Sequence, residues 1–169
     1  MNILAGRFKG RNIKTSQKLG YRPMKSIVRK SIFDSLEPFN YLSVLDLFSG
    51  TGIFGFESAS RGANKVTFVE KNFRSYILLK KNSEIFDDIC FDFFQMDVFK
   101  FFNKNKSFDL IYADPPYGKF NLFKLIDFSL VLLKRNGKLF LECEKKVEPF
   151  MNANCKDFGD TRILYWKNI

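Results

Sequence analysis

Short apolar runs that alternate with helical segments are the feature of residues 42–169 that most restricts the fold. The run at 44–48 is apolar apart from Asp46, which is typical of a strand buried on both faces. Further runs lie at 65–70, 90–96, 108–113, 138–142 and 162–166. This alternation predicts an α/β fold, a mostly parallel sheet with helices on both faces.

Acidic residues lie at the ends of four of these runs. Asp46 is near the end of the first, and Glu70, Asp97 and Asp114 end the next three. The carboxyl ends of parallel strands meet at one edge of the sheet, where ligands bind in such folds. We therefore expect the four carboxylates to line one site, although each alone is also compatible with an ordinary solvated strand end.

A glycine loop, Ser49-Gly50-Thr51-Gly52-Ile53-Phe54-Gly55, follows the first run and formally matches the dinucleotide fingerprint G-x-G-x-x-G. Glycines let the backbone approach a ligand, and the N–H groups of the following helix point at it. Glu70 lies where ribose hydroxyls are bound, and Asp97 could accept a hydrogen bond from an adenine amine. These residues together predict an adenosine-type ligand. The glycines alone fit a tight strand–helix turn equally well.

The second candidate site is Asp114-Pro115-Pro116-Tyr117. Proline has a fixed φ and no N–H, so this tetrapeptide must end the strand in a stiff turn. The turn offers a carboxylate, carbonyls and an aromatic face in fixed relation. Such a set could hold a flat ring that bears an amine, by hydrogen bonds in its plane and stacking on its face. A rigid turn with Tyr117 covering the core is the simpler alternative.

Positive charge is concentrated at the N-terminus. Residues 1–33 carry nine Lys or Arg and no acid, whereas the whole chain has a net charge of +10. This asymmetry predicts a polyanionic partner, with a solvated tail as the alternative. In the segment Arg7-Phe8-Lys9-Gly10-Arg11, cations alternate with an aromatic residue, as in nucleic-acid-contacting strands.

The basic segment divides into two predicted elements. Residues 1–20 are predicted to be irregular or hairpin-like, with a turn region from Gly6 to Gly10. A helix is expected from Arg22-Pro23 to Pro38. Its apolar face would carry Ile27, Ile32, Phe33 and Leu36, and its polar face Lys25, Arg29 and Lys30.

Several function classes are disfavoured by composition. Histidine is absent, which removes imidazole bases and most zinc hydrolases, and no metal site is expected. Three widely spaced cysteines without a C-x-x-C pattern fit a reducing compartment. No apolar run approaches the ~20 residues that span a bilayer, and no signal-peptide core is evident. We expect a cytoplasmic protein without membrane contact.

At this point the chain resembles a known family. The motif from Asp46 to Gly52 is similar to the first motif of class I S-adenosylmethionine-dependent methyltransferases. Asp114-Pro115-Pro116-Tyr117 is similar to the fourth motif of those that act on exocyclic amines of nucleobases. The basic N-terminal segment, Arg22-Pro23, Val28-Arg29, Phe68-Val69-Glu70-Lys71 and Phe158-Gly159-Asp160-Thr161 resemble the bacterial small-subunit (16S) ribosomal RNA guanine-N2 methyltransferases. Phe158 departs from the tyrosine expected there.

The resemblance implies a Rossmann-like domain over 39–169 with a seven-stranded sheet, and a basic RNA-contacting extension over 1–38. It implies methyl transfer from S-adenosylmethionine to guanine N2 of small-subunit ribosomal RNA, free or in the 30S particle, by a monomer. The implied catalytic residues are Asp114, Pro115, Pro116 and Tyr117. The implied cofactor-binding residues are Asp46, Ser49, Gly50, Thr51, Gly52, Glu70 and Asp97. The implied RNA-binding residues are Arg7, Lys9, Arg11, Arg22 and Arg29.

Three alternatives remain open at the level of sequence. A DNA adenine-N6 methyltransferase shares both motifs, but no target-recognition domain is evident. A nicotinamide-dependent oxidoreductase would use the glycine loop and leave Asp114 to Tyr117 unexplained. A non-enzymatic RNA-binding module would explain the basic segment and leave the strand-end acids without a role.

Overall fold

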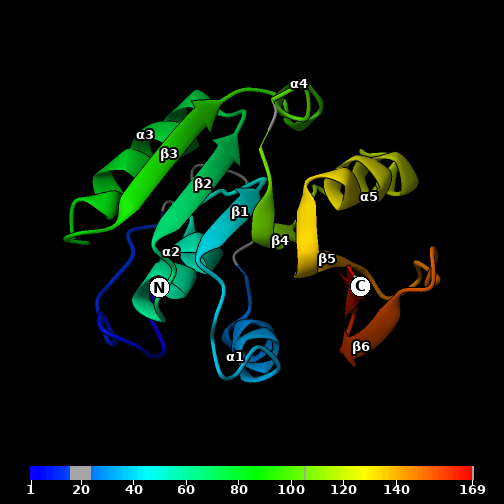
Figure 1. Ribbon diagram of the computed structural model, residues 1–169, viewed down its shortest axis with the longest axis horizontal. Helices are drawn as coiled ribbons and strands as arrows, with labels where there is room; N and C mark the ends of the chain where they lie inside the picture. Colours follow the sequence, from blue (N-terminus) through cyan, green and yellow to red (C-terminus); the bar gives the residue numbers. More distant parts are fainter. Residues whose placement is uncertain (16–23, 105, 169) are drawn as a thin grey trace.

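The computed structural model describes residues 1–15, 24–104 and 106–168, and Figure 1 shows the arrangement of its elements. In this described part, seven strands form one sheet with the order β3-β2-β1-β4-β5-β7-β6. The strands are β1 (Ser43–Leu47), β2 (Lys65–Glu70), β3 (Cys90–Gln95), β4 (Phe108–Ala113), β5 (Leu133–Glu144), β6 (Asn154–Phe158) and β7 (Thr161–Lys167).

The sheet is mostly parallel, as predicted. The pairs β1–β2, β1–β4, β2–β3 and β4–β5 are parallel, whereas β7 runs antiparallel to β5 and β6. The strand β6 is not evident as an apolar run, because most of its residues are exposed at the edge of the sheet. The order reverses at β1, so the carboxyl ends of β1 and β4 flank a crevice of the kind that binds ligands.

Five helices of the described chain cover the two faces of the sheet: α1 (Ser26–Asp34), α2 (Ile53–Ser60), α3 (Phe73–Ser83), α4 (Val98–Phe101) and α5 (Leu122–Val131). Side chains alternate between faces along a strand. Val44 and Leu110 accordingly pack in one core cluster with α1, α2 and α3. Leu45 and Ile111 pack in a second cluster with α4 and α5. The sheet therefore lies between two apolar layers.

The buried face of α1 differs from the prediction. Ile27 is 64% exposed, whereas Val28, Arg29, Ile32 and Phe33 are buried. The buried stripe therefore begins at Val28, one residue after the predicted Ile27. Residues 28 and 32, like residues 29 and 33, are four positions apart and share one face of the helix. The placement of Arg29 on the polar face of this helix was wrong.

Residues 1–15, called the arm below, form a hairpin, and positions 16–20 of the segment predicted to be irregular or hairpin-like lie outside the described residues. Asn2 bridges Asn12, and the Ile3 N–H donates to the Arg11 carbonyl at 3.0 Å. In Figure 1 the arm lies beside α2. Ile3, Phe8 and Ile13 are buried in the same core cluster as α2. The arm therefore packs as part of the main fold and has no core of its own.

Candidate active site

A cavity of about 890 Å³ opens at the carboxyl ends of β1, β2 and β4. It is the crevice expected from the strand order, and the predicted residues converge on it. Of the cofactor-binding set, Asp46, Ser49, Gly50, Thr51, Glu70 and Asp97 line the cavity, as do Asp114, Pro115, Pro116 and Tyr117. The structure thus brings both sequence motifs to one site.

Ser49 ties the glycine loop to two strands. Its Oγ donates to the Asp46 carbonyl at 2.7 Å and accepts from the Val69 N–H at 3.1 Å. Its own N–H donates to the Val69 carbonyl at 3.2 Å. The loop therefore begins at a fixed position between β1 and β2, which orients the backbone that follows.

Two glycines are required by the loop geometry. Gly52 precedes α2 with φ +76°, and a Cβ there would collide with Leu79 and Phe56. At Gly55 a Cβ would collide with the ring of Phe68 on β2. Gly52 does not line the cavity, so its contribution is to shape the turn while its neighbours form the wall. Close helix–strand packing at the third glycine is a feature of dinucleotide-type loops.

Glu70 is built into the same loop. Its Oε2 accepts from the Gly50 N–H at 2.9 Å, and its Oε1 accepts from the Asn72 N–H at 2.6 Å. These bonds fix the carboxylate at the end of β2, facing the cavity. Each carboxylate oxygen has a second lone pair, so Glu70 can still accept hydrogen bonds from a ligand hydroxyl.

Asp46 is the most deeply buried acid of the site. It is 2% exposed, and its Oδ2 accepts from the Gly55 N–H at 3.1 Å. Burial raises the pKa of Asp46 well above its usual value, and the nearby Glu70 carboxylate raises it further. A carboxyl group in this environment gains from a cationic ligand, because a positive charge favours its ionised form.

Asp97 lies on the loop after β3 and lines the cavity. Its Oδ1 caps α4 by accepting from the Phe99 N–H at 3.0 Å, and its Oδ2 lies 3.2 Å from the Lys71 ammonium. A single carboxylate thus holds a helix N-terminus and one wall of the cavity in place. Its remaining acceptor capacity is available to a ligand amine.

The Asp114 to Tyr117 turn starts where β4 ends. The parallel pairing of Leu47 with Ala113 sets this turn beside the end of β1. Pro115 is buried, Pro116 is exposed, and Asp114 and Tyr117 are half-buried at the cavity wall. A carboxylate and an aromatic side chain therefore stand next to each other on a stiff turn.

Sequence reasoning missed a supporting layer beneath this turn. The Tyr112 ring stacks on Phe54 at 4.1 Å between centroids, and its hydroxyl donates to Glu142 at 2.7 Å. Burial raises the pKa of Tyr112 well above its usual value, and the Asp114 and Glu142 carboxylates add to the effect. Tyr112 precedes Asp114 by two residues, so the period of a strand could have placed it on the same side.

The lining suits S-adenosylmethionine. A cavity of this size, a glycine loop before a helix, and fixed carboxylates from three strand ends match a ligand with an amine, a ribose and a cationic centre. Phe48 and Phe120, whose ring centroids are 4.7 Å apart, add apolar surface to the wall. Asp46, Gly50, Glu70 and Asp97 are the residues that would hold the cofactor.

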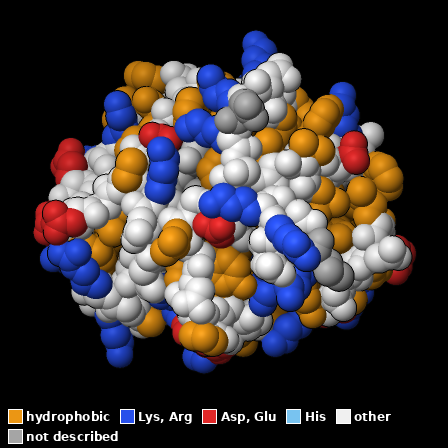
Figure 2. All heavy atoms as spheres, viewed as in Figure 1, with side chains coloured by type: hydrophobic (Ala, Val, Ile, Leu, Met, Phe, Trp, Pro, Cys, Tyr) orange, Lys and Arg blue, Asp and Glu red, His pale blue; other side chains and the backbone are white. Residues whose placement is uncertain are grey.

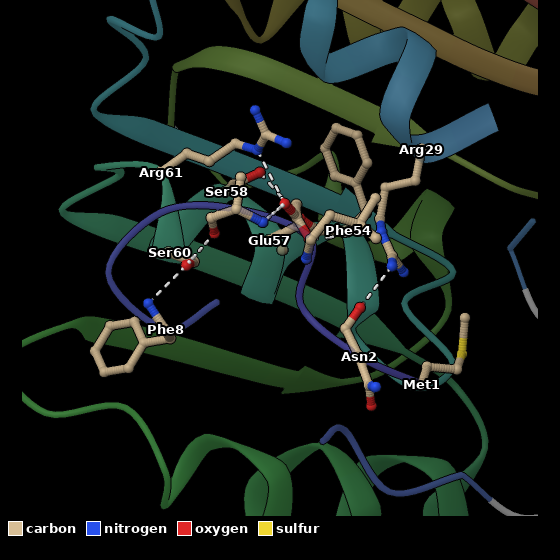
Figure 3. Close-up of polar contacts among 12 residues, drawn as sticks. Met1, Asn2, Phe8, Arg29, Phe54, Glu57, Ser58, Ser60 and Arg61 are labelled. Atoms are coloured by element: carbon tan, nitrogen blue, oxygen red, sulfur yellow. Dashed lines mark hydrogen bonds and ion pairs between the residues drawn. The ribbon is translucent and has the colours of Figure 1, made fainter. Parts of the chain in front are cut away.

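A buried charge cluster attaches the arm to α2 (Figure 3). Glu57 accepts from the N–H groups of Leu4 and Ala5 at 2.7 and 3.1 Å, and from Arg61 Nε at 2.9 Å. Arg29 Nε lies 3.5 Å from Glu57, and its guanidinium donates to the Asn2 carbonyl at 2.7 Å.

Arg29 must therefore be removed from the RNA-binding set. Its side chain is 2% exposed and serves the arm's attachment instead. Burial lowers the pKa of Arg29, while the Glu57 carboxylate opposes that shift. The sequence could not reveal this, because Glu57 is 28 positions away and its burial depends on the fold. Arg22, also predicted to bind RNA, lies outside the described residues.

The other predicted arm cations are at the surface. Arg7, Lys9 and Arg11 are exposed, and the guanidinium groups of Arg7 and Arg11 lie 5.0 and 5.2 Å from the centroid of the Phe8 ring. Arg7 also pairs with Asp88 at 3.4 Å. Figure 2 shows Lys and Arg spread over the face in view, with fewer acidic side chains. The surface is thus suited to a polyanion.

Membrane spans and metal clusters are both absent from the described residues. No helix in this part of the chain is long and apolar enough to cross a bilayer. Nor do the described Cys, Asp and Glu side chains form a group of three or more that could hold a metal ion.

Comparisons with known proteins identify the family of this chain. Residues 1–166 match the family described as Conserved hypothetical protein 95. Ribosomal RNA small subunit methyltransferase D of Haemophilus influenzae is 31% identical over 162 residues, covering 86% of this chain and 79% of that protein.

Two solved structures share the fold. A hypothetical protein of Thermus thermophilus superposes with a TM-score of 0.84 at 24% identity, covering 98% of each chain. A 16S rRNA guanine-N2 methyltransferase of the same species, solved with S-adenosylmethionine and guanosine, has a TM-score of 0.74 at 19% identity. It matches 90% of this chain and 45% of its own. The matched family and the curated relative show that the chain belongs to the small-subunit ribosomal RNA methyltransferase family that its motifs resemble.

Proposed function

We propose that this protein transfers a methyl group from S-adenosylmethionine to the exocyclic N2 amine of a guanine in small-subunit ribosomal RNA. The observation that carries the proposal is the convergence of the glycine loop and Asp114-Pro115-Pro116-Tyr117 on one cavity. Family membership supports the RNA substrate, since the Haemophilus relative is named a ribosomal RNA small subunit methyltransferase.

When bound, the cofactor would supply an electrophilic methyl group on a sulfonium. The protein therefore has mainly to position the amine, which is an effect of proximity and orientation. In this proposal Asp46, Glu70 and the loop backbone bind the cofactor, and Asp114 to Tyr117, which line the same cavity, bind the acceptor. Such a division would set the two reactants against each other, and the transfer would need no histidine base.

Asp114 and Pro115 provide the acceptors for the amine. The nitrogen lone pair of guanine N2 is delocalised into the ring. Hydrogen bonds from its N–H groups to the Asp114 carboxylate and the Pro115 carbonyl favour a more tetrahedral, nucleophilic nitrogen. Positive charge develops on that nitrogen during transfer, so these bonds strengthen in the transition state and lower the barrier. The extra proton then leaves readily to solvent.

Tyr117 supplies the face on which the base stacks. A guanine within a helix cannot reach the cavity, so the target must be unstacked or already single-stranded. The half-buried Tyr117 replaces the lost stacking at a fixed position, because the two prolines before it stiffen the turn. Arg7, Lys9 and Arg11 on the arm would contact phosphates of the surrounding RNA.

The setting of the reaction is part of the proposal. The substrate is small-subunit RNA, free or in an assembling 30S particle, and the enzyme works as a monomer in the cytoplasm where that particle is made. DNA adenine-N6 methylation is the alternative, because the fourth motif alone does not separate the two amines.

The deciding experiment measures transfer of labelled methyl from S-adenosylmethionine to three acceptors: unmethylated 30S subunits, free small-subunit RNA and duplex DNA. Nuclease digestion and chromatography then identify the modified base. We expect label on guanine N2 of the subunit or its RNA. Label on DNA adenine would replace this proposal by its alternative, and absence of transfer to all three would contradict it.

A further inference from the structure

Asn82, on α3, is hydrogen-bonded to the arm and to the glycine loop at once. Its Oδ1 accepts from the Lys14 N–H at 3.0 Å, and its Nδ2 donates to the Lys14 carbonyl at 3.0 Å. The same Nδ2 donates to the Thr51 carbonyl at 3.3 Å. Asn82 is 2% exposed and its bond to Thr51 is buried, whereas its two bonds to Lys14 are partly buried. One amide thus joins a basic segment to a cavity wall 31 residues before it in sequence.

A second contact joins the arm to the same loop residue. The Thr51 hydroxyl lies 4.0 Å from the Met1 sulfur. Met1 is held in turn by Ile13, whose N–H donates to the Met1 carbonyl at 2.6 Å. Both edges of the hairpin, one through Met1 and the other through Lys14 and Asn82, therefore end at Thr51.

The loop has little room to move independently of α3. Leu79, one turn before Asn82 on α3, is fully buried, and its side chain fills the space that a Cβ on Gly52 would need. The Gly52 N–H also donates to the Ser49 carbonyl at 2.7 Å. Because protein interiors are close-packed, a displacement of the buried Asn82 side chain shifts the Thr51 carbonyl rather than being absorbed in a void.

We infer that Asn82 is a positioning residue that couples RNA binding on the arm to cofactor binding in the glycine loop. This inference rests on the proposed function. RNA phosphates on the arm fix the backbone at Lys14, and the Asn82 amide passes that restraint to Thr51. A loop already ordered by one ligand costs less entropy to order for the other. Each ligand therefore strengthens the binding of the other by the same factor.

The coupling is measured by calorimetric titration of S-adenosylhomocysteine into the full chain, alone and with saturating unmethylated small-subunit RNA. This ligand has no methyl group to transfer, so the RNA stays unmodified during the titration. We expect the wild-type dissociation constant to fall at least about fivefold when RNA is present. An unchanged constant in the wild-type protein would overturn the inference.

Two variants test the role of Asn82 itself. Asn82→Asp keeps an acceptor for the Lys14 N–H but sets a carboxylate against the Lys14 and Thr51 carbonyls. Asn82→Ala removes all three bonds. In both, the ratio of the two dissociation constants should fall to about 1. A ratio that stays at the wild-type value would show that the coupling does not pass through Asn82, and would overturn the inference.

The matched control is Asn12→Ala. It removes an amide hydrogen bond of 2.9 Å to Asn2 within the same arm, at an exposed site without a bond to the loop. Its ratio should equal that of the wild type, and loss of coupling there would refute a specific role for Asn82. A merely structural role would weaken both constants together and leave their ratio unchanged. If the wild type binds both ligands independently, only this inference fails; if it binds neither, the proposed function fails.

Discussion

The Oδ2 atom of Asp46 accepts a hydrogen bond of 3.1 Å from the backbone N–H of Gly55, so a carboxyl group at the end of β1 caps the first turn of α2. A negative charge near a helix N-terminus is favourable, but Asp46 is 2% exposed and its burial disfavours that charge. The net result is a raised pKa. The same residue therefore limits stability while it provides a site for a cationic ligand.

The first prediction concerns Asp46→Asn. In the wild-type protein the pKa of Asp46 in the folded state lies above the unfolded value of about 3.9, so the folded chain binds the proton more tightly. The stability that Asp46 contributes is present at low pH and declines as pH rises from about 4 through the folded pKa. Asn cannot ionise, and its carbonyl can still accept from Gly55. We expect the variant's advantage in free energy of unfolding to grow with pH above about 4, measured by urea denaturation.

The same variant should bind S-adenosylmethionine more weakly, by about 10- to 100-fold, because a hydrogen-bonded charge is lost from the cavity. Asp88→Asn is the control, since the Asp88 side chain is 84% exposed and remote from the cavity wall. It should change neither the pH dependence nor the affinity. A variant at Asp46 that is less stable than the wild type at pH 8 would contradict the burial argument.

The candidate site could largely be predicted from the sequence because its residues obey a topological rule. Glu70, Asp97 and Asp114 end consecutive runs, and parallel strands bring such ends together whatever the details of packing. Gly50 and Gly52 are recognisable because close backbone approach and positive φ require glycine. The cavity-lining residues among these thus follow from local sequence and strand direction.

Contacts between distant segments could not be predicted in this way. The burial of Arg29 depends on Glu57, and the role of Asn82 depends on Lys14 and Thr51. Nothing in the spacing of these residues indicates that they meet. The exposed strand β6 has a similar cause, because an edge strand lacks the apolar pattern that marks a buried one.

The second prediction concerns Asp114→Ala. It removes the carboxylate proposed to accept from the amine but leaves the glycine loop untouched. We expect kcat for methyl transfer to fall at least about 100-fold, while the Kd for S-adenosylmethionine stays within a few-fold. Asp127→Ala, at an exposed position of α5, is the control and should be fully active. Loss of cofactor binding in the Asp114 variant would mean that this residue has been misassigned.

The third prediction concerns Arg29→Met. The variant leaves the buried Glu57 with Arg61 and two backbone N–H groups only. Removing one partner of a buried pair costs about 3–5 kcal/mol, and we expect the lower end because these other partners remain. Chemical denaturation gives the free energy of unfolding. Lys30→Met is the control on the same helix, since its pair with Asp34 is exposed and should contribute little. Equal effects of the two substitutions would refute a structural role for Arg29.

The last prediction concerns the arm cations. Deleting residues 1–20 would also remove Ile3, Phe8 and Ile13 from the core, so point substitutions are the better test. Each lost phosphate contact should reduce the slope of log K against log salt by about 0.7–0.9, because fewer counterions are released on binding. We therefore expect the double variant Arg7→Gln, Lys9→Gln to bind RNA more weakly. The slope of log K against log salt should fall by nearly twice the amount given for one contact. Lys146→Gln, which removes a charge near the C-terminal end of β5, is the control. An unchanged slope in the double variant would show that these exposed cations do not contact phosphate.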